Sequence, residues 1–566
     1  MAVVLKVSPQ RLQEIQMDHS TKWNRVFILG LDGATWTVLD PMIQRGVMPN
    51  LARLRQRSAW GEMISCIPPV TSAAWTTMIT GNGPHKHGVF DHRCFDAESR
   101  RMRVNHSARV RVPTMFHKLS EIGKTVVSIN VPVTYPPLKV NGLVVSGLDS
   151  PHLEAALSGN EGFAAAVRKE LPDYHHRVLW KRPPANASEF QNSANESRKL
   201  FAARAESAWI ADRMFPDWST MMVQFQNLDP FQHRCWRYLN IDEIGIDDPP
   251  MNRAAESAMN ALDSAIGRLM ELAEARGAGV LVSSDHGFGH CSGRIAINRI
   301  LIDKGLAFEP SLLGTVRRRR QQAMDHLRLW LEKQQDKEAR SASFDTTIDA
   351  QYPLDWKRTL GFAPHQDTAG MVYLNRSWYR KGAPLSTPRQ IDDAKSQFMQ
   401  VLDEVTDPTN GSKLFKQVID VASAHNLDPA REGFPDVIAL PRKDLWVRTK
   451  ITNRPDWLEP DPDLPGTHRP EGIIMASGAG IEAGQKLSCR LIDFAPTVLG
   501  RLGQSGLAVN MEGSDIFGTP LTSHRKDNGH SSVTTPHAPL HAPGFEYDDE
   551  EQRLIEQRLA DLGYLE

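Results

Sequence analysis

Seven side chains with oxygen or nitrogen donors can together hold two metal ions beside a nucleophilic hydroxyl. They fall in five separate segments, in the order Asp32, Thr71, Asp229 with His233, Asp285 with His286, and His468. Carboxylates and imidazoles without thiolates favour Zn²⁺ or Mn²⁺ over Ca²⁺, and we expect Zn²⁺. Two such ions about 3.5–4 Å apart would clamp the attacking and leaving oxygens of a phosphate transfer. The ordered set therefore predicts a two-metal site for phosphate chemistry.

The expected ligands divide into two sets. These are Asp32, Thr71, Asp285 and His286 for one ion, and Asp229, His233 and His468 for the other. Three carboxylates and a threonine alkoxide carry four negative charges, which two divalent ions cancel. The remaining local field would then stabilise charge that grows on the phosphorus oxygens.

Thr71 is the expected nucleophile. It follows Pro68, Pro69 and Val70, and the sequence TSAAWTTMIT that it opens is typical of a helix ending at Thr80-Gly81. We therefore expect Thr71 to be the helix N-cap. Threonine is an ordinary cap, but a helix N-terminus also favours a phosphate, and a nearby cation would lower the hydroxyl pKa.

Each piece alone also has a purely structural interpretation. Asp32-Gly33 and Asp285-His286-Gly287 are typical turn sequences. Asp229 and His233, four residues apart, could form a surface helix pair, and His468 could be a loop histidine. The functional interpretation rests on their conjunction and order.

Three apolar runs place the acidic residues at one edge of a sheet. They cover residues 25–33, 221–229 and 279–287, and each has an aspartate at or near its end. Residues 252–277 have helical periodicity between the last two, so we predict a parallel strand–helix–strand crossover. Ligands in open α/β sheets gather beyond the carboxyl ends of the strands. The predicted sheet therefore places the three aspartates where a ligand site is expected.

Further alternation predicts an α/β fold with a mostly parallel central sheet flanked by helices, plus cap insertions. The additional strands are expected at 125–133, 142–146, 370–375, 435–440 and 472–476, and the additional helices at 387–405 and 491–502.

The 566 residues are expected to form a polar leader (1–24), one catalytic domain (25–519) with insertions near 151–215 and 311–360, and a tail (520–566) that ends in a helix. The ligand positions span most of that domain. Specificity would come from the two insertions. A basic run, Arg317 to Arg320, is most simply a solvated helix face.

Composition limits the partners. Lys plus Arg total 66 against 67 for Asp plus Glu, so no global field favours nucleic acid or an anionic membrane. The five cysteines are scattered without a CxxC pair, which indicates a reducing compartment. No stretch has the roughly 20 apolar residues of a membrane span. We expect a cytoplasmic protein and leave its oligomeric state open.

The motifs resemble those of the alkaline phosphatase superfamily, most closely its type I phosphodiesterase/nucleotide pyrophosphatase branch. The resemblance rests on LGLDG (29–33), MPNLARL (48–54), PPVTSAAWTTMITGNGPHKHGV (68–89), DPFQH (229–233), SDHGFG (284–289), GTHRPEGI (466–473) and APTVL (495–499). It implies an alkaline phosphatase-like core, Thr71 as the phosphate-accepting nucleophile and the other six residues as ligands of two ions.

Some positions depart from the family pattern. The branch often has an Asn shortly after the HG motif, where this chain has Asp91 and His92. His92, and Arg469 beside His468, are our candidates for phosphate contact. The Cys-x-Pro-x-Arg setting of sulfatase relatives is missing, and the third metal set of phosphomonoesterases cannot be located. The lack of that third set favours singly charged diesters.

The sequence thus predicts a two-metal hydrolase that cleaves phosphodiester or phosphoanhydride bonds of small molecules, nucleotide-linked compounds among them. A phosphomonoesterase or phosphomutase of the same superfamily is the nearest alternative, because fold alone does not fix the reaction. A binding protein that retains the fold is a second alternative, but it would be expected to have lost ligands.

Overall fold

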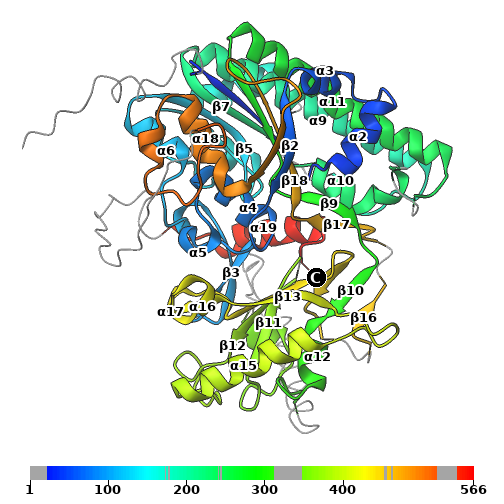
Figure 1. Ribbon diagram of the computed structural model, residues 1–566, viewed down its shortest axis with the longest axis vertical. Coiled ribbons are helices and arrows are strands. Elements are labelled where there is room, and N and C mark those ends of the chain that lie inside the picture. Colours follow the sequence, from blue (N-terminus) through cyan, green and yellow to red (C-terminus); the bar gives the residue numbers. More distant parts are fainter. Residues whose placement is uncertain are drawn as a thin grey trace, which may run out of the picture. The chain divides into compact units, whose positions relative to one another are not determined.

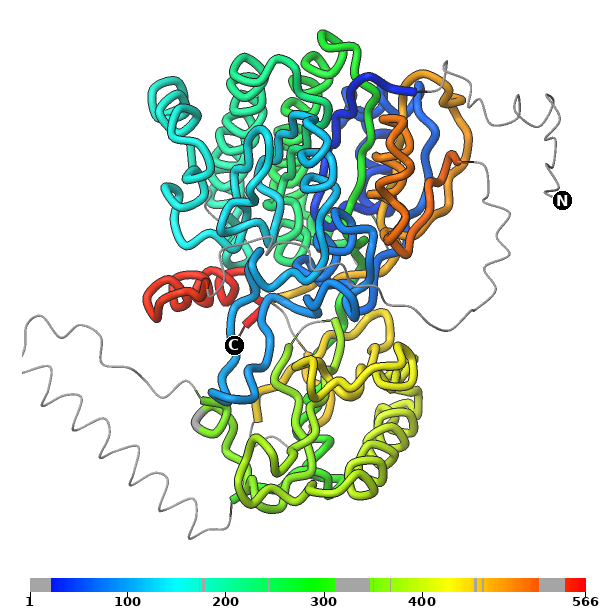
Figure 2. Tube along the Cα trace, turned by 90° about the vertical axis from the view of Figure 1, so that its left-hand side faces the viewer, coloured from blue at the N-terminus to red at the C-terminus, as the bar shows by residue number. Residues whose placement is uncertain are grey.

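The computed structural model describes residues 22–172, 174–175, 179–239, 241, 245–310, 347–366, 368–451, 456–460, 463–518 and 545–565. The chain forms two compact units (Figures 1 and 2). Unit 1 comprises Met1–Val89, His106–Gly289 and His468–Arg558, and unit 2 comprises Phe90–Asn105, His290–Thr467 and Leu559–Glu566. All seven predicted site residues from Asp32 to His468 belong to unit 1.

Unit 1 is built on an eight-stranded sheet. Its strand order is β19 (Lys486–Arg490), β2 (Ala59–Ile64), β18 (Glu471–Ser477), β8 (Gly279–Ser283), β1 (Val26–Leu31), β7 (Trp218–Phe225), β5 (Thr125–Val131) and β6 (Gly142–Ser146). β1 lies parallel to both β7 and β8, and only β18 runs antiparallel to its neighbours. This confirms the predicted mostly parallel sheet.

The central strand β1 is buried on both faces, which explains its continuous apolar sequence. Phe27, Leu29 and Leu31 pack into one hydrophobic core, and Val26 and Ile28 pack into another. Side chains of a strand alternate between faces, so a strand covered on both sides needs apolar residues at every position.

Helices cover both faces of this sheet, as Figure 1 shows. One core is completed by α2 (Trp36–Gln44), α3 (Pro49–Gln56), α8 (Glu161–Glu170), α9 (Ala187–Met214), α10 (Leu228–Cys235) and α11 (Pro249–Ala275). The other is completed by α4 (Thr71–Thr80), α6 (Met115–Glu121) and α18 (Phe494–Arg501).

Unit 2 has its own core around an antiparallel sheet of β11 (Gly361–His365), β12 (Gly370–Leu374), β14 (Val437–Pro441) and β13 (Phe415–Asp420). Helix α15 (Pro388–Glu404) packs on this sheet through Ala394, Phe398 and Leu402. The strands expected at 370–375 and 435–440 therefore exist, but they belong to this separate sheet.

The remaining α-helices and strands are short apart from the terminal helix. They are α5 (Pro84–His87), α7 (Leu153–Leu157), α12 (Ile297–Asp303), α14 (Ile348–Gln351), α16 (Val421–His425), α17 (Pro429–Glu432), α19 (Asp549–Leu562), β3 (Arg93–Asp96), β4 (Arg101–Val104), β9 (Gly287–His290), β10 (Gly293–Ala296), β15 (Leu445–Arg448), β16 (Leu458–Glu459) and β17 (Gly466–Arg469). No helix among the described residues is both long and apolar enough to cross a bilayer.

The regions predicted as additions differ in what can be described. Residues 151–215 hold α7, α8 and the 28-residue helix α9. The Asn186 side chain caps α9 by accepting a hydrogen bond from the Glu189 N–H. The basic run at 317–320 and residues 520–544 of the tail lie outside the described residues. The predicted terminal helix is present as α19.

Candidate active site

Three neighbouring strands deliver the three aspartates. Asp32 directly follows β1, Asp285 comes two residues after β8, and Asp229 lies in the first turn of α10, shortly after β7. Because β1 lies between β7 and β8 and all three are parallel, their carboxyl ends meet at one edge. The predicted strand ending at Asp229 is too long by four residues, since β7 ends at Phe225.

Thr71 is the first residue of α4, so the prediction that it caps this helix is wrong by one position. Val70 occupies the N-cap in an extended conformation, and its side chain makes no cap hydrogen bond. The Thr71 hydroxyl lies 3.4 Å from His286 Nε2 instead. It is fully buried. The hydroxyl is thus directed at a predicted metal ligand.

The first ligand cluster consists of Asp32, Asp285 and His286, which are all buried. His286 Nε2 lies 3.3 Å from Asp285 Oδ2 and 3.8 Å from Asp32 Oδ1. The second Asp285 oxygen accepts a hydrogen bond from the Gly33 N–H (3.0 Å). One oxygen of Asp285 is therefore anchored, and the other faces the cluster.

The second cluster consists of Asp229, His233 and His468, with His286 beside it. His468 Nε2 lies 3.0 Å from both Asp229 Oδ1 and His233 Nε2. His233 Nε2 is 3.5 Å from Asp229 Oδ2, one helical turn away on α10. Asp229, His286 and His468 could share one ion by the proximity of their donor atoms. His286 thus lies between the two clusters, 3.9 Å from Asp229 Oδ1.

Backbone contacts set the orientation of two imidazoles. His468 Nδ1 lies 3.1 Å from the Pro69 carbonyl oxygen, and His286 Nδ1 lies 3.1 Å from that of Gly287. A carbonyl oxygen only accepts, so a proton on each Nδ1 would be donated to it and would leave each Nε2 with the lone pair that a metal ion needs. A metal-ligating histidine commonly donates its other ring N–H in this way.

The carboxylates also fit cations. Asp32 Oδ1 and Asp285 Oδ2 are buried and accept no hydrogen bond from any described residue. Burial, followed by the neighbouring Asp285 and Asp229 charges, raises the pKa of Asp32 well above its usual value. Burial also raises the pKa of Asp285. Buried carboxylates need nearby positive charge to be stable in their ionised form. Two divalent cations held by these residues would supply it.

The two predicted phosphate contacts have different surroundings. Arg469 donates to the His468 carbonyl (2.9 Å), and its side chain lies over Gly289, where a Cβ would come within 2.6 Å of Arg469 Nε. His92 belongs to unit 2, where its ring stacks on Tyr564 at 4.5 Å. Contact of either residue with phosphate stays a prediction.

His365 Nδ1 pairs with the Asp91 carboxylate (2.5 Å), and His365 Nε2 lies 3.1 Å from the Tyr373 hydroxyl, all within unit 2. Burial alone would raise the pKa of Asp91, but the interactions with His365, His92 and Arg93 together outweigh burial and lower this pKa. The sequence did not reveal this pairing, because 274 residues separate Asp91 from His365.

Sequence reasoning also missed the two residues that hold Asp32. Trp75 Nε1 and Gln224 Nε2 donate to Asp32 Oδ2, at 2.8 and 2.7 Å. One signal was available, because Trp75 lies four residues after Thr71 and therefore on the same face of its helix.

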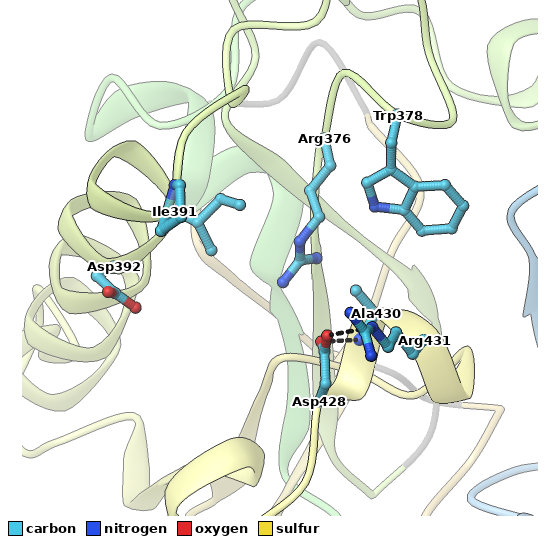
Figure 3. A pocket seen from close by; sticks show the side chains of 8 residues that line it. Arg376, Trp378, Ile391, Asp392, Asp428, Ala430 and Arg431 are labelled. Atoms are coloured by element: carbon cyan, nitrogen blue, oxygen red, sulfur yellow. Dashed lines mark hydrogen bonds and ion pairs between the residues drawn. The ribbon is translucent and has the colours of Figure 1, made fainter.

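Unit 2 also contains an open cavity of about 690 Å³ (Figure 3). Its lining residues are Arg376, Trp378, Pro388, Ile391, Asp392, Asp428, Ala430 and Arg431. Asp428 and Arg431 form an ion pair (3.3 Å), drawn in Figure 3, and Asp436 binds the Arg376 guanidinium. None of the predicted site residues lines this cavity.

Comparison with known proteins identifies the family. The model of the type I phosphodiesterase/nucleotide pyrophosphatase family matches residues 26–470. The chain belongs to this family. As a member of it, the chain is an enzyme with a candidate two-metal site, and the family implies phosphate ester substrates. The alternative of a binding protein without turnover is therefore set aside.

One solved structure supports the fold, and a second is similar over much of its length. Phosphonoacetate hydrolase from Sinorhizobium meliloti 1021 aligns with a TM-score of 0.50 at 16% identity, over 85% of this chain and 96% of that one. Murine ectonucleotide pyrophosphatase/phosphodiesterase 5 aligns at 12% identity over 85% and 95% of the two chains, with a TM-score of 0.44. No curated protein matches the chain. The first likeness confirms the alkaline phosphatase-like α/β fold.

Proposed function

We propose that this family member is a two-metal hydrolase that cleaves phosphodiester or phosphoanhydride bonds, including those of nucleotide-linked compounds, through a phosphothreonine intermediate. The observation that carries the proposal is the convergence of the Thr71 hydroxyl and two Asp/His clusters at one buried sheet edge. Two divalent cations, Zn²⁺ or Mn²⁺, would lower the pKa of the hydroxyl and neutralise charge on the phosphorus oxygens.

The chain's own residues perform the covalent step. Thr71 Oγ, once its proton has passed to solvent, attacks phosphorus in line with the leaving group. The Oγ–P bond forms as the bond to the leaving oxygen breaks, and that oxygen keeps the electron pair and takes a proton from water. Water then attacks phosphorus, releases the product and restores the Thr71 hydroxyl.

Burial contributes to this chemistry. Thr71, Asp32 and His286 are shielded from solvent, so fixed charges act there at lower effective dielectric than in water. Thr71 also begins α4, and the helix N-terminus favours the negative charge of a phosphate. Arg469, beside the ligand His468, is our proposed additional phosphate contact.

Replacement of Thr71 tests the nucleophile. Thr71→Ala should lower turnover by about 10³-fold or more while metal content stays near normal, because six other ligands remain. Thr76→Ala is the matched control, since Thr76 is a buried threonine of the same helix whose hydroxyl donates to the Ser72 carbonyl (2.7 Å). Acid quench and mass spectrometry should find the covalent adduct on Thr71. Wild-type rates in Thr71→Ala would refute the assignment.

A substrate panel tests the bond that is cleaved. Purified protein of measured metal content would be assayed with bis-p-nitrophenyl phosphate, p-nitrophenyl phosphate, nucleotide anhydrides and phosphonoacetate. We expect a preference for the diester and the anhydrides. A large preference for the monoester would favour the phosphomonoesterase or phosphomutase alternative instead.

A further inference from the structure

The two oxygens of the Asp32 carboxylate have different surroundings. Oδ2 accepts hydrogen bonds from Trp75 Nε1 (2.8 Å) and Gln224 Nε2 (2.7 Å). Oδ1 accepts none from any described residue and lies on the side of His286 Nε2, at 3.8 Å. Two donors on one oxygen fix the plane of the carboxylate and leave the other oxygen available to the metal cluster.

Trp75 ties this carboxylate to the helix of the nucleophile. It lies one turn after Thr71 on α4 and is fully buried. Its ring fits against Gly30, because a Cβ there would come within 2.6 Å of Trp75 Cη2. An indole N–H can only donate, so this buried group needs an acceptor, which Asp32 provides. The contact thus couples the position of Asp32 to that of α4.

Gln224 supplies the second donor with a fixed amide orientation. It lies on β7 opposite Gly30 of β1. Its Oε1 accepts a hydrogen bond from Asn130 Nδ2 (2.7 Å), and its Nε2 also donates to Gln226 Oε1 (3.1 Å). An Asn Nδ2 only donates, so the nitrogen of Gln224 is the atom that faces Asp32.

We propose that Trp75 and Gln224 are positioning residues. They hold Asp32 so that it can bind one metal ion, and they thereby fix the position of that ion relative to the Thr71 hydroxyl. The inference rests on the proposed function, because it assumes that Asp32 is a metal ligand. Partners that orient a ligand commonly affect metal affinity by about 10–100-fold. If the two contacts were merely structural, they would only satisfy the buried indole N–H, and their removal would leave metal affinity unchanged.

A matched control exists in the same unit. Trp218 is also fully buried, and its Nε1 donates to the Asp212 carboxylate at 2.8 Å. Asp212 is not a predicted ligand, and it pairs with Arg276. Trp218→Phe therefore removes the same kind of hydrogen bond and the same ring volume as Trp75→Phe, but away from the candidate active site.

The test is a titration of full-length apoprotein with Mn²⁺, followed by the electron paramagnetic resonance signal of free Mn²⁺. Wild type, Trp75→Phe, Gln224→Leu, Trp218→Phe and Asp32→Asn would be compared. We expect Trp75→Phe and Gln224→Leu to weaken one of the two sites by about 10–100-fold, and Trp218→Phe to leave both sites unchanged. Turnover by Trp75→Phe should recover at saturating metal.

The outcomes separate this inference from the proposed function. If Asp32→Asn weakens one site but Trp75→Phe and Gln224→Leu match the Trp218→Phe control, the positioning role is refuted and the metal site stands. If Asp32→Asn binds Mn²⁺ as wild type does, the ligand assignment itself fails. Gln224→Leu decides the matter by itself if Trp75→Phe does not fold.

Discussion

His87 links the stability of the active-site region to pH. Its ring is fully buried and lies beside α4, where Thr77 Oγ1 is 2.9 Å from Nε2. The Val89 N–H donates to Nδ1 (3.2 Å), so Nε2 carries the only ring proton and donates it to Thr77. Burial lowers the pKa of His87 to about 3. His87 is therefore neutral in the folded protein throughout the usual pH range.

The sign and size of the effect follow from this pKa. An unfolded histidine binds a proton below about pH 6.5, whereas the folded His87 does so only near pH 3. The unfolded state thus binds more protons below pH 6.5, and the free energy of unfolding falls by about 1.4 kcal/mol per pH unit there. Between pH 7.5 and pH 5 the loss amounts to about 2 kcal/mol.

A comparison of wild type with His87→Gln isolates this contribution. Glutamine cannot titrate, so the stability difference between the two proteins should shrink by about 2 kcal/mol from pH 7.5 to pH 5. Urea unfolding followed by tryptophan fluorescence, at one fixed metal concentration, measures it. Metal ligands titrate in both proteins and cancel in the difference. A difference that does not change with pH would refute the buried neutral histidine.

Two further perturbations give clear expectations. Chelation of the metals should lower the melting temperature by about 4–5 °C. Free ions at 100-fold excess over Kd stabilise by about 2.7 kcal/mol per site, and the unfolding entropy of a chain of 566 residues is about 1.2 kcal/mol/K. Identical melting curves before and after chelation would count against the two clusters as metal sites. Glu512→Gln should destabilise the protein by about 1–2 kcal/mol at pH 7 after allowance for solvent screening. Burial alone would raise the pKa of Glu512, but hydrogen bonds from His85 (3.0 Å) and the Gly83 N–H (2.8 Å) outweigh it and lower the pKa to about 2. Glu512 therefore stabilises the fold above about pH 4.5, and its contribution is lost as pH falls towards 2, so denaturant unfolding should show the two proteins converging at acid pH.

Much of the fold was predictable because its information is local. The apolar run around β1 has no alternation, since both faces of the central strand are covered, and the helical periodicity of 252–277 gave α11 to within a few residues. Turn sequences such as Asp32-Gly33 marked the ends of strands. The order of aspartates after successive strands then predicted that they would converge, as parallel strands present their carboxyl ends at one edge.

Other features depended on contacts between distant segments. Strands were predicted at 370–375 and 435–440, yet the sequence of a strand does not show which strand it pairs with. The observed strands β12 and β14 pair in a separate antiparallel sheet. Likewise, no local pattern shows that Asp91 meets His365, or that α4 begins at Thr71 rather than one residue later. The packing of the whole core determines which strands pair and which distant side chains meet.

The sequence by itself determined which side chains are available for the chemistry and the order in which the strands deliver them. Only the tertiary structure decided the arrangement of the clusters, with His286 between them and Asp32 held by Trp75 and Gln224. The physical reason is the sequence separation over which each kind of information acts. Residue type and periodicity act over a few positions, whereas hydrogen bonds to Asp32 join residues 43 and 192 positions apart, which only the packing of β1 against β7 and α4 brings together.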